Sequence, residues 1–315
     1  MNSRKSPRKL MGAMLVIVSL TGCFASTNPA GPSPTFPTGA QPVQPTGQAS
    51  TCSRGEPSIL GVLRSTDHGA TWTSLGNACL PDSTIGAVDP TGLVVDGQIV
   101  LYFVDIRFFN QPVPQVLYRA TSTDGMNFDT PQPAYTQTRT MIDPFVLRLQ
   151  DGSFRLYVRS DQEGIISAVS SDGLAFTRED GVRSSVGDVP GALLLPDNRV
   201  RLFVCNGMII SYISSDGLNF AEESGVRIPA DSSTVVHNPQ PIQLNDRSYL
   251  MLFSVHPTDR SGQVDPWTFT ETHLATSTDG FDWTANPTII GYGGTSCAVE
   301  MPDGTLYVYY VNRNS

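Results

Sequence analysis

Four polar residues recur beside prolines along the chain, and their types suggest hydrolytic chemistry. Asp89 and Asp143 directly precede Pro, whereas Asp188 and His237 come two residues before Pro. Carboxyl groups that gather at one site can take the two roles that glycoside cleavage needs. One stays ionised as base or nucleophile, while another keeps a proton for the leaving oxygen. An Asp-Pro pair is also a common turn initiator, so the sequence leaves a structural and a functional interpretation open.

A second group of residues follows the strands that we expect beside these aspartates. It includes two long segments, residues 107–115 and 256–271, and long loops on one face of a scaffold commonly carry binding sites. Their aromatic residues, among them Phe108 and Phe109, can stack on sugar rings or equally cap the loops onto the fold. We expect the substrate-binding residues to be His237, Arg107, Arg159, Trp267 and His256, with Asp105 and Asp161 on the same face.

Composition excludes several kinds of function. Four of the 20 basic residues lie within the first 22 positions, which leaves 16 arginines and no lysine against 29 acidic residues. This acidic balance argues against nucleic acid as a partner, and the lack of lysine excludes a Schiff-base mechanism after residue 22. No second histidine stands at metal-ligand spacing from His237, so we predict neither a metal site nor a cofactor.

Two repeated hairpins must position these residues. One contains a Ser-Ser/Thr-Asp-Gly-type turn, at residues 65–72, 122–128, 170–176, 214–220 and 277–283. The other spans residues 87–104, 142–158, 188–204, 237–253 and 296–311. The two kinds alternate, beginning with the first and ending with the second. Such repeats predict an all-β, five-bladed β-propeller over residues 55–315, in which the N-terminal and C-terminal hairpins close the ring within one blade.

The turn motifs resemble the Asp-box repeats of sialidases and other carbohydrate-active propellers, in which the box is structural. Because neighbouring turns of an antiparallel blade alternate between faces, we expect any central site on the face opposite these turns. The overall layout resembles the five-bladed arabinanase, β-xylosidase and invertase-like glycosidases. By position, that resemblance implies Asp89 as general base, Asp143 as modulator of the acid's pKa, and Asp188 as acid. The family's acid is Glu, so the shorter Asp188 is a departure.

The N-terminal segment predicts export and anchoring. Residues 1–22 combine a basic start with a short apolar run, which is typical of a signal peptide. The segment that ends at Cys23 resembles the lipobox of bacterial lipoproteins, which implies acylation of Cys23; the alternative is an ordinary signal peptide with a chance cysteine. Residues 23–54 are rich in Pro, Gly, Ser and Thr and predict a tether. We therefore expect a lipid-anchored, extracytoplasmic protein of the bacterial cell envelope.

The remaining cysteines allow three pairings. We predict a Cys52–Cys79 disulfide, because these two residues bracket one turn motif. For Cys205 and Cys297, two buried thiols are favoured over a bridge. For the whole chain we expect a propeller that hydrolyses or binds glycans with its carboxylates, and the alternative is a non-catalytic binding or scaffold propeller of the envelope. The sequence leaves open whether the protein is an enzyme.

Overall fold

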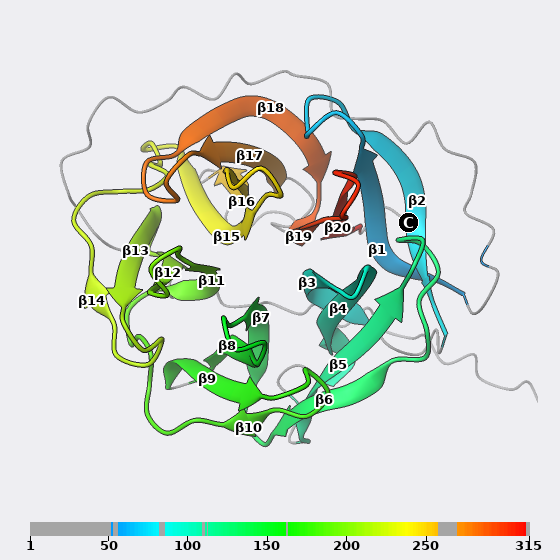
Figure 1. Ribbon diagram of the computed structural model, residues 1–315, viewed down its shortest axis with the longest axis horizontal. Helices are drawn as coiled ribbons and strands as arrows, with labels where there is room; N and C mark the ends of the chain where they lie inside the picture. Colours follow the sequence, from blue (N-terminus) through cyan, green and yellow to red (C-terminus); the bar gives the residue numbers. More distant parts are fainter. Residues whose placement is uncertain are drawn as a thin grey trace, which may run out of the picture.

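The chain folds as an all-β, five-bladed propeller (Figure 1), as the repeats predict. The computed structural model describes Cys52, residues 56–81, 86–108, 111, 113–161, 163–257 and 270–312. Each blade is a four-stranded antiparallel sheet. In chain order we call them the first blade (β3 to β6), the second (β7 to β10), the third (β11 to β14), the fourth (β15 to β18) and the closing blade (β19, β20, β1 and β2).

Each blade contributes one strand to each of four concentric layers. The inner strands are β3 (Ala87–Val95), β7 (Met141–Arg148), β11 (Asp188–Leu194), β15 (Thr234–Gln243) and β19 (Gly294–Glu300). The second strands are β4 (Gln98–Asp105), β8 (Phe154–Ser160), β12 (Val200–Cys205), β16 (Tyr249–Pro257) and β20 (Leu306–Val311). The third strands are β5 (Gln115–Ser122), β9 (Gly164–Ser170), β13 (Ile209–Ser214), β17 (Glu271–Ser277) and β1 (Glu56–Ser65). The outer strands are β6 (Gln132–Gln137), β10 (Thr177–Arg178), β14 (Ala221–Glu222), β18 (Thr284–Tyr292) and β2 (Thr73–Leu80).

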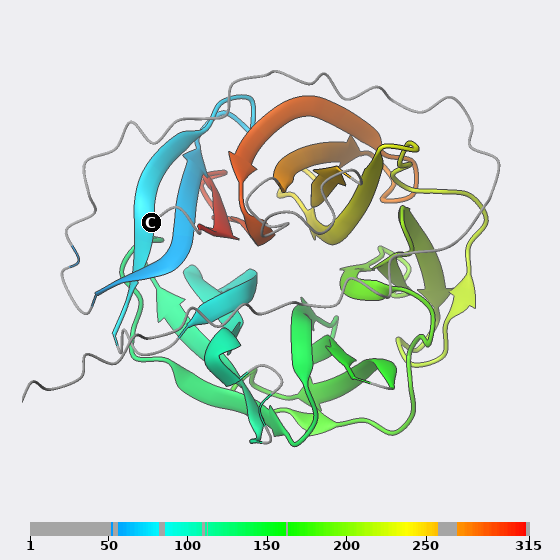
Figure 2. The same cartoon turned by 180° about the vertical axis from the view of Figure 1, so that it is seen from behind.

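The two ends of the propeller meet in the closing blade (Figure 2). Strand β1 pairs antiparallel with β20 over six residue pairs, from Leu60 opposite Val311 to Ser65 opposite Leu306. This pairing covers two strand edges that would otherwise be open to other chains. The predicted closure of the ring is therefore confirmed.

The five turns that join third to outer strands share one hydrogen-bond pattern. In the turn of the third blade, Ser214 Oγ donates to Asp216 Oδ1 at 2.8 Å, and Gly217 N donates to Ser214 Oγ at 2.9 Å. The carboxylate also accepts from the backbone N–H groups of Leu218 and Asn219, each at 2.8 Å. These bonds stabilise the charged form, so the pKa of Asp216 lies well below its ordinary value. The aspartates of these turns therefore stabilise the turns in which they lie.

Aromatic contacts join the turns of the first four blades to the blade that precedes each of them. Phe220 packs edge-on against Tyr157, and the Tyr157 hydroxyl donates to Gly217 O at 2.8 Å. Tyr102 and Tyr309 make the same bond to turn glycines of the second and first blades. Where the second strand carries Phe203 instead, the turn carries Trp283, whose indole N–H reaches Gly280 O at 3.2 Å. The buried carbonyl is satisfied either way.

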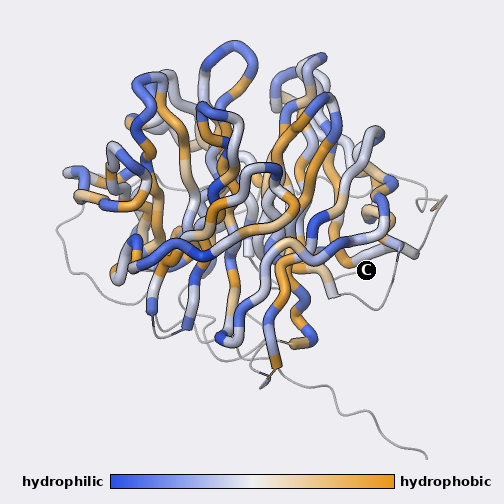
Figure 3. Tube along the Cα trace, turned by 60° about the horizontal axis from the view of Figure 1, so that its bottom comes forward, coloured by the Kyte–Doolittle hydropathy of each residue, from blue (hydrophilic) through white to orange (hydrophobic). Residues whose placement is uncertain are grey.

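Apolar side chains fill the spaces between blades. Hydrophobic segments run along the strands while hydrophilic ones occupy the turns (Figure 3). The inner strands approach closely: a Cβ added at Gly191 on β11 would lie 2.1 Å from the carbonyl oxygen of Pro239 on β15. Glycine is required here by the space between strands, since Gly191 has no positive φ.

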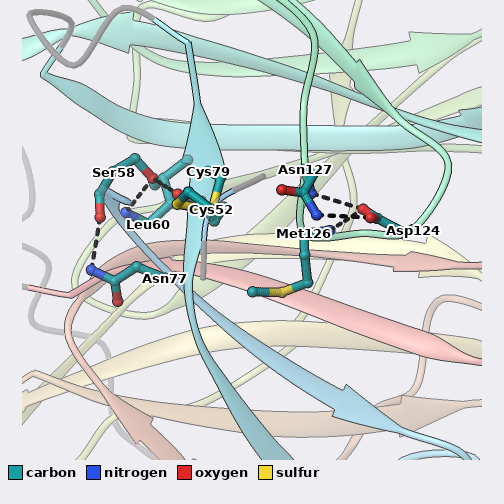
Figure 4. Close-up of a disulfide and its surroundings, with 9 residues drawn as sticks. Cys52, Ser58, Leu60, Asn77, Cys79, Asp124, Met126 and Asn127 are labelled. Carbon is teal, nitrogen blue, oxygen red and sulfur yellow. Dashed lines mark hydrogen bonds between the residues drawn. A yellow bond between two sulfur atoms is a disulfide. The ribbon is translucent and has the colours of Figure 1, made fainter. Parts of the chain in front are cut away.

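A disulfide joins Cys52 to Cys79 on β2, with the Cα atoms 5.5 Å apart (Figure 4). Cys79 also pairs with the first blade, because its N–H donates to Met126 O at 2.8 Å and its carbonyl accepts from Phe128 N at 3.0 Å. Cys297 is free and buried, and it is the only free cysteine in the part of the chain that the structure describes. The expectation of buried thiols therefore holds for Cys297 and is wrong for Cys205, which is buried but disulfide-bonded.

Three residues with predicted roles, Cys23, Phe109 and Trp267, lie outside the described residues. Among the residues that are described, no helix is long and apolar enough to cross a membrane.

Candidate functional site

The inner strands share a backbone irregularity near their first residues. In the first four blades the pairing with the second strand slips by a residue, for instance between Val88 and Thr91. One residue at each slip has a positive φ of 51° to 54°, and a proline follows it; these residues are Asp89, Asp143, Val189 and Asn238. Such bulges re-aim side chains, and Asp and Asn tolerate the left-handed conformation better than most residues.

The strand register shows that the four polar residues near prolines do not all occupy equivalent positions on their strands, although their spacing from proline suggested that they do. Asp89 and Asp143 do occupy the same position in successive blades. Asp188 and His237 precede the bulged residue and pair with Cys205 and Ser254 of the neighbouring strand. The four polar residues therefore fall on two register positions instead of one. The offset arises because the left-handed Val189 or Asn238 stands between Asp188 or His237 and the proline, whereas Asp89 and Asp143 are themselves the left-handed residues.

The structure nevertheless brings the three aspartates together. The backbone N–H of Asp143 contacts Asp89 Oδ2 at 3.3 Å, although 54 residues separate them. Burial raises the pKa of Asp143 well above its ordinary value, and the charges of Asp89 and Asp188 add to the rise while Arg159 opposes it. Asp143 therefore holds its proton to a higher pH than an exposed aspartate.

Arg159 is the cation of this cluster. Its Nε lies 2.8 Å from Asp188 Oδ1, and both side chains are largely buried. Burial raises the pKa of Asp188; Arg159 pulls it down, and the charge of Asp161 raises it further. We call Asp89, Asp143, Asp188 and Arg159 the carboxylate cluster. Arg159, predicted only as a substrate-binding residue, thus bears directly on the ionisation of two of the aspartates.

Arg107 has a different partner. The buried carboxylate of Asp105 accepts from Arg107 Nε at 2.9 Å and from its Nη2 at 2.5 Å, and it also accepts from Gly86 N at 3.1 Å. The guanidinium lies 5.5 Å from the ring centre of Phe108, within a short 3-10 turn, η1 (Ile106–Phe108). This pair fixes the end of β4 and the start of the loop that follows.

His237 and His256 form a buried pair on the fourth blade. They are 4% and 3% exposed, and their rings meet edge-to-face with centres 6.4 Å apart. Burial, with a smaller contribution from His256, lowers the pKa of His237 to about 4, so its ring is neutral near pH 7. A neutral imidazole can offer a ligand both a donor and an acceptor. Among the described residues, no group of three metal-ligating side chains is assembled.

Thr295 joins the site without having been predicted. It is the bulged residue of β19, between Gly294 and Ser296, and its hydroxyl donates to Asp89 Oδ1 at 2.8 Å. No proline follows it, so the signal used for the other blades missed it. Alignment of the fifth inner hairpin with the other four would have shown a polar residue at the same place.

The opposite end of the inner strands has another character. A hollow of about 470 Å³ there is lined mainly by aliphatic side chains and Phe145, with Arg148, Gln243 and Glu300 among its polar residues. The three aspartates do not line this hollow. The carboxylate cluster belongs to the end where the inner strands begin, as the alternation of turns predicts.

Comparison with known proteins supports the fold. No protein-family model matches this sequence, and no curated protein sequence matches it. Solved structures do match. A thermostable family-43 glycoside hydrolase has a TM-score of 0.52 at 16% identity, covering 71% of this chain and 83% of its own. The endo-arabinase of Bacteroides thetaiotaomicron VPI-5482 has a TM-score of 0.52 at 14% identity, and the match covers 72% of this chain and 90% of the endo-arabinase. A GH43 protein from Bacillus licheniformis has a TM-score of 0.56 at 12% identity, and the match covers 71% of this chain and 48% of that protein. At these identities the likeness shows that the chain shares the five-bladed propeller fold of these enzymes.

Proposed function

We propose that this protein acts on glycans through the carboxylate cluster, as a glycoside hydrolase of the propeller type. The single observation that carries the proposal is the gathering of Asp89, Asp188 and Arg159 around Asp143 at one end of the inner strands. Several carboxyl groups with separated proton affinities are what general acid–base cleavage of a glycosidic bond needs. The fold shared with family-43 enzymes agrees with this chemistry but does not by itself assign it.

Within the cluster we assign the proton to Asp143. Burial raises the pKa of Asp143, and its two carboxyl neighbours, Asp89 and Asp188, add to the rise. Asp89 accepts hydrogen bonds from the Thr295 hydroxyl and the Asp143 N–H, and such donors favour the ionised form required of a base. Asp188 is held by Arg159, so its charge is partly neutralised. The family resemblance instead implies Asp188 as the acid, a role that would require this ion pair to loosen when a glycan binds.

The same ion pair favours a second candidate, a binding propeller without turnover. The Arg159–Asp188 contact of 2.8 Å withdraws the third carboxyl group from proton transfer, and the aspartate side chain is shorter than the glutamate of the enzyme family. A binder needs only hydrogen-bonding groups and stacking surfaces around the site. His237, His256 and Arg159 would serve such a role.

We further propose that the propeller is held outside the cytoplasm by acyl groups on Cys23, with its turns being Asp boxes. The support is the sequence: the signal-like residues 1–22, the lipobox-like segment and the uncharged stretch of residues 24–50. Mass spectrometry of the N-terminal peptide from membranes should find Cys23 acylated. A Cys23→Ser variant should leave the membrane fraction, and an unmodified Cys23 would contradict the proposal.

Turnover and binding are tested together. The purified protein is screened on chromogenic glycosides and a glycan array, beside Asp143→Asn and Asp188→Asn. Asp197→Asn, an exposed turn residue, is the matched control. We expect turnover in the wild type, a loss of about 100-fold or more in kcat for Asp143→Asn, and no change in the control. Glycan binding without turnover would select the second candidate, and neither binding nor turnover would overturn both.

A further inference from the structure

The closing blade contributes a direct contact to the carboxylate cluster. Thr295 lies 206 residues from Asp89 in sequence, yet its hydroxyl is 2.8 Å from Asp89 Oδ1. The other oxygen, Asp89 Oδ2, receives the N–H of Asp143 at 3.3 Å. The carboxylate of Asp89 is therefore held from the closing blade on one side and from the second blade on the other.

We propose that Thr295 is a positioning residue, which orients the Asp89 carboxylate and keeps it ionised so that the proton of the Asp89–Asp143 pair resides on Asp143. This inference deepens the proposed function and rests on it for its catalytic meaning. A hydroxyl that donates to a carboxylate stabilises the charged form and fixes its plane. Two adjacent carboxyl groups cannot easily ionise together, so stabilising the charge on one leaves the proton on the other.

The environment of Thr295 suits this role. The residue is 7% exposed, so water competes little for its hydroxyl. Its bulge in β19 places it in the ring of positions that also holds Asp89 and Asp143. Since β19 belongs to the closing blade, the site gains this contact only when the ring is complete. Valine has nearly the shape of threonine but cannot donate, which separates the hydrogen bond from packing.

A second threonine offers a matched control. Thr91 also lies on an inner strand and is 1% exposed, but its hydroxyl accepts from Val146 N at 3.3 Å and touches none of the three aspartates in any hydrogen bond of the described chain. Thr91→Val should therefore weaken the fold without changing the charge distribution of the pair. Any effect shared by both valine variants would be structural.

The experiment follows carboxyl titration in the full-length protein labelled with ¹³C at aspartate side-chain carboxyl groups. Asp89→Asn and Asp143→Asn assign the two resonances. In Thr295→Val, the lower apparent pKa of the pair should rise by about one pH unit, Thr295→Ser should restore it, and Thr91→Val should leave it unchanged. Thr295→Ala, which also lacks the donor, replaces Thr295→Val if that variant does not fold.

Unchanged titration in the donor-less variant, or an equal rise in Thr91→Val, would overturn the inference. The result is independent of glycan chemistry. If no glycan is bound or cleaved, the proposed function fails while the titration still decides the role of Thr295. If a substrate is found, the acidic limb of the kcat/KM profile should move to higher pH by the same amount in Thr295→Val and return in Thr295→Ser.

Discussion

At the scale of single residues, Asp143 should destabilise the fold at neutral pH. Its unfolded pKa is near 3.8, and its folded pKa lies well above that value because of burial and neighbouring carboxylates. The folded state therefore keeps a proton that the unfolded chain has lost, and stability falls as pH rises from about 3.8 through the folded pKa. We expect Asp143→Asn to raise the free energy of unfolding by about 1–3 kcal/mol at pH 7, and by much less at pH 3. Urea unfolding at both pH values checks this, and a variant less stable than the wild type at pH 7 would contradict it.

Asp216 should behave in the opposite way. Backbone and side-chain donors of Asn219 and the N–H of Leu218 hold the pKa of Asp216 below its ordinary value. Its contribution to stability is present above the unfolded pKa and is lost as pH falls through the folded one. Asp216→Asn should therefore lower the urea midpoint at pH 7, and the difference from the wild type should shrink towards pH 2. A midpoint that rises at pH 7 would show that the turn does not need the charge.

At the scale of strands and turns, the carbonyl group of the turn glycine that packs against the preceding blade needs one hydrogen-bond donor. That donor comes either from the preceding blade or from the turn itself. In the third and fourth blades that donor is the indole of Trp283, facing Phe203. Trp283→Phe leaves the carbonyl of Gly280 without it and should cost about 2–4 kcal/mol, including the lost volume. Adding Phe203→Tyr supplies a hydroxyl in the geometry of Tyr157, so the double variant should recover about 1 kcal/mol in urea unfolding. Strictly additive losses would refute this exchange.

The spacing of inner strands gives a second prediction at this scale. At Gly191, a methyl group would meet the Pro239 carbonyl oxygen at 2.1 Å, and both groups lie on rigid backbone. Gly191→Ala should therefore destabilise the protein by about 2 kcal/mol or more. Gly152, in an exposed turn with a φ of 86° and no atom within 4 Å of an added Cβ, is the control. Gly152→Ala should cost about 1 kcal/mol from backbone conformation alone. Equal losses in thermal unfolding would mean that the inner strands can separate.

Sequence patterns predicted the elements better than the register within them. Alternating apolar residues and Asp-Gly turns placed the hairpins, because each signal is local. The offset of Asp188 from the bulged Val189 could not be read in this way, since a bulge depends on how two strands pair. Thr295 was missed for a related reason: its bulge carries no proline, and its partner Asp89 lies far away in sequence.

At the scale of the whole molecule, the repeat count alone predicted the closed ring. An odd hairpin at each end leaves four blades to be read along the chain and a fifth to be assembled from the two ends, and β1 pairs with β20 accordingly. The repeat count could not predict which contacts hold the closing blade in place. These contacts lie between the closing and first blades and involve residues without a repeated pattern, such as Cys79 and Met126.

We call the contact between the closing blade and the first blade the seam. The disulfide should stabilise the seam as well as its own hairpin. It closes a loop with a sequence separation of 27, for which chain entropy predicts about 3.5 kcal/mol of stabilisation. Because Cys79 pairs with Met126 and Phe128, loosening β2 also loosens the first blade. The double variant Cys52→Ser with Cys79→Ser should lose about 2–4 kcal/mol in urea unfolding. In this variant, amide exchange should accelerate at position 79 and at Phe128 more than in β8, which lies away from the seam. Uniform acceleration throughout the ring would instead mean that the blades open together, since a seam that fails first must show its weakness locally.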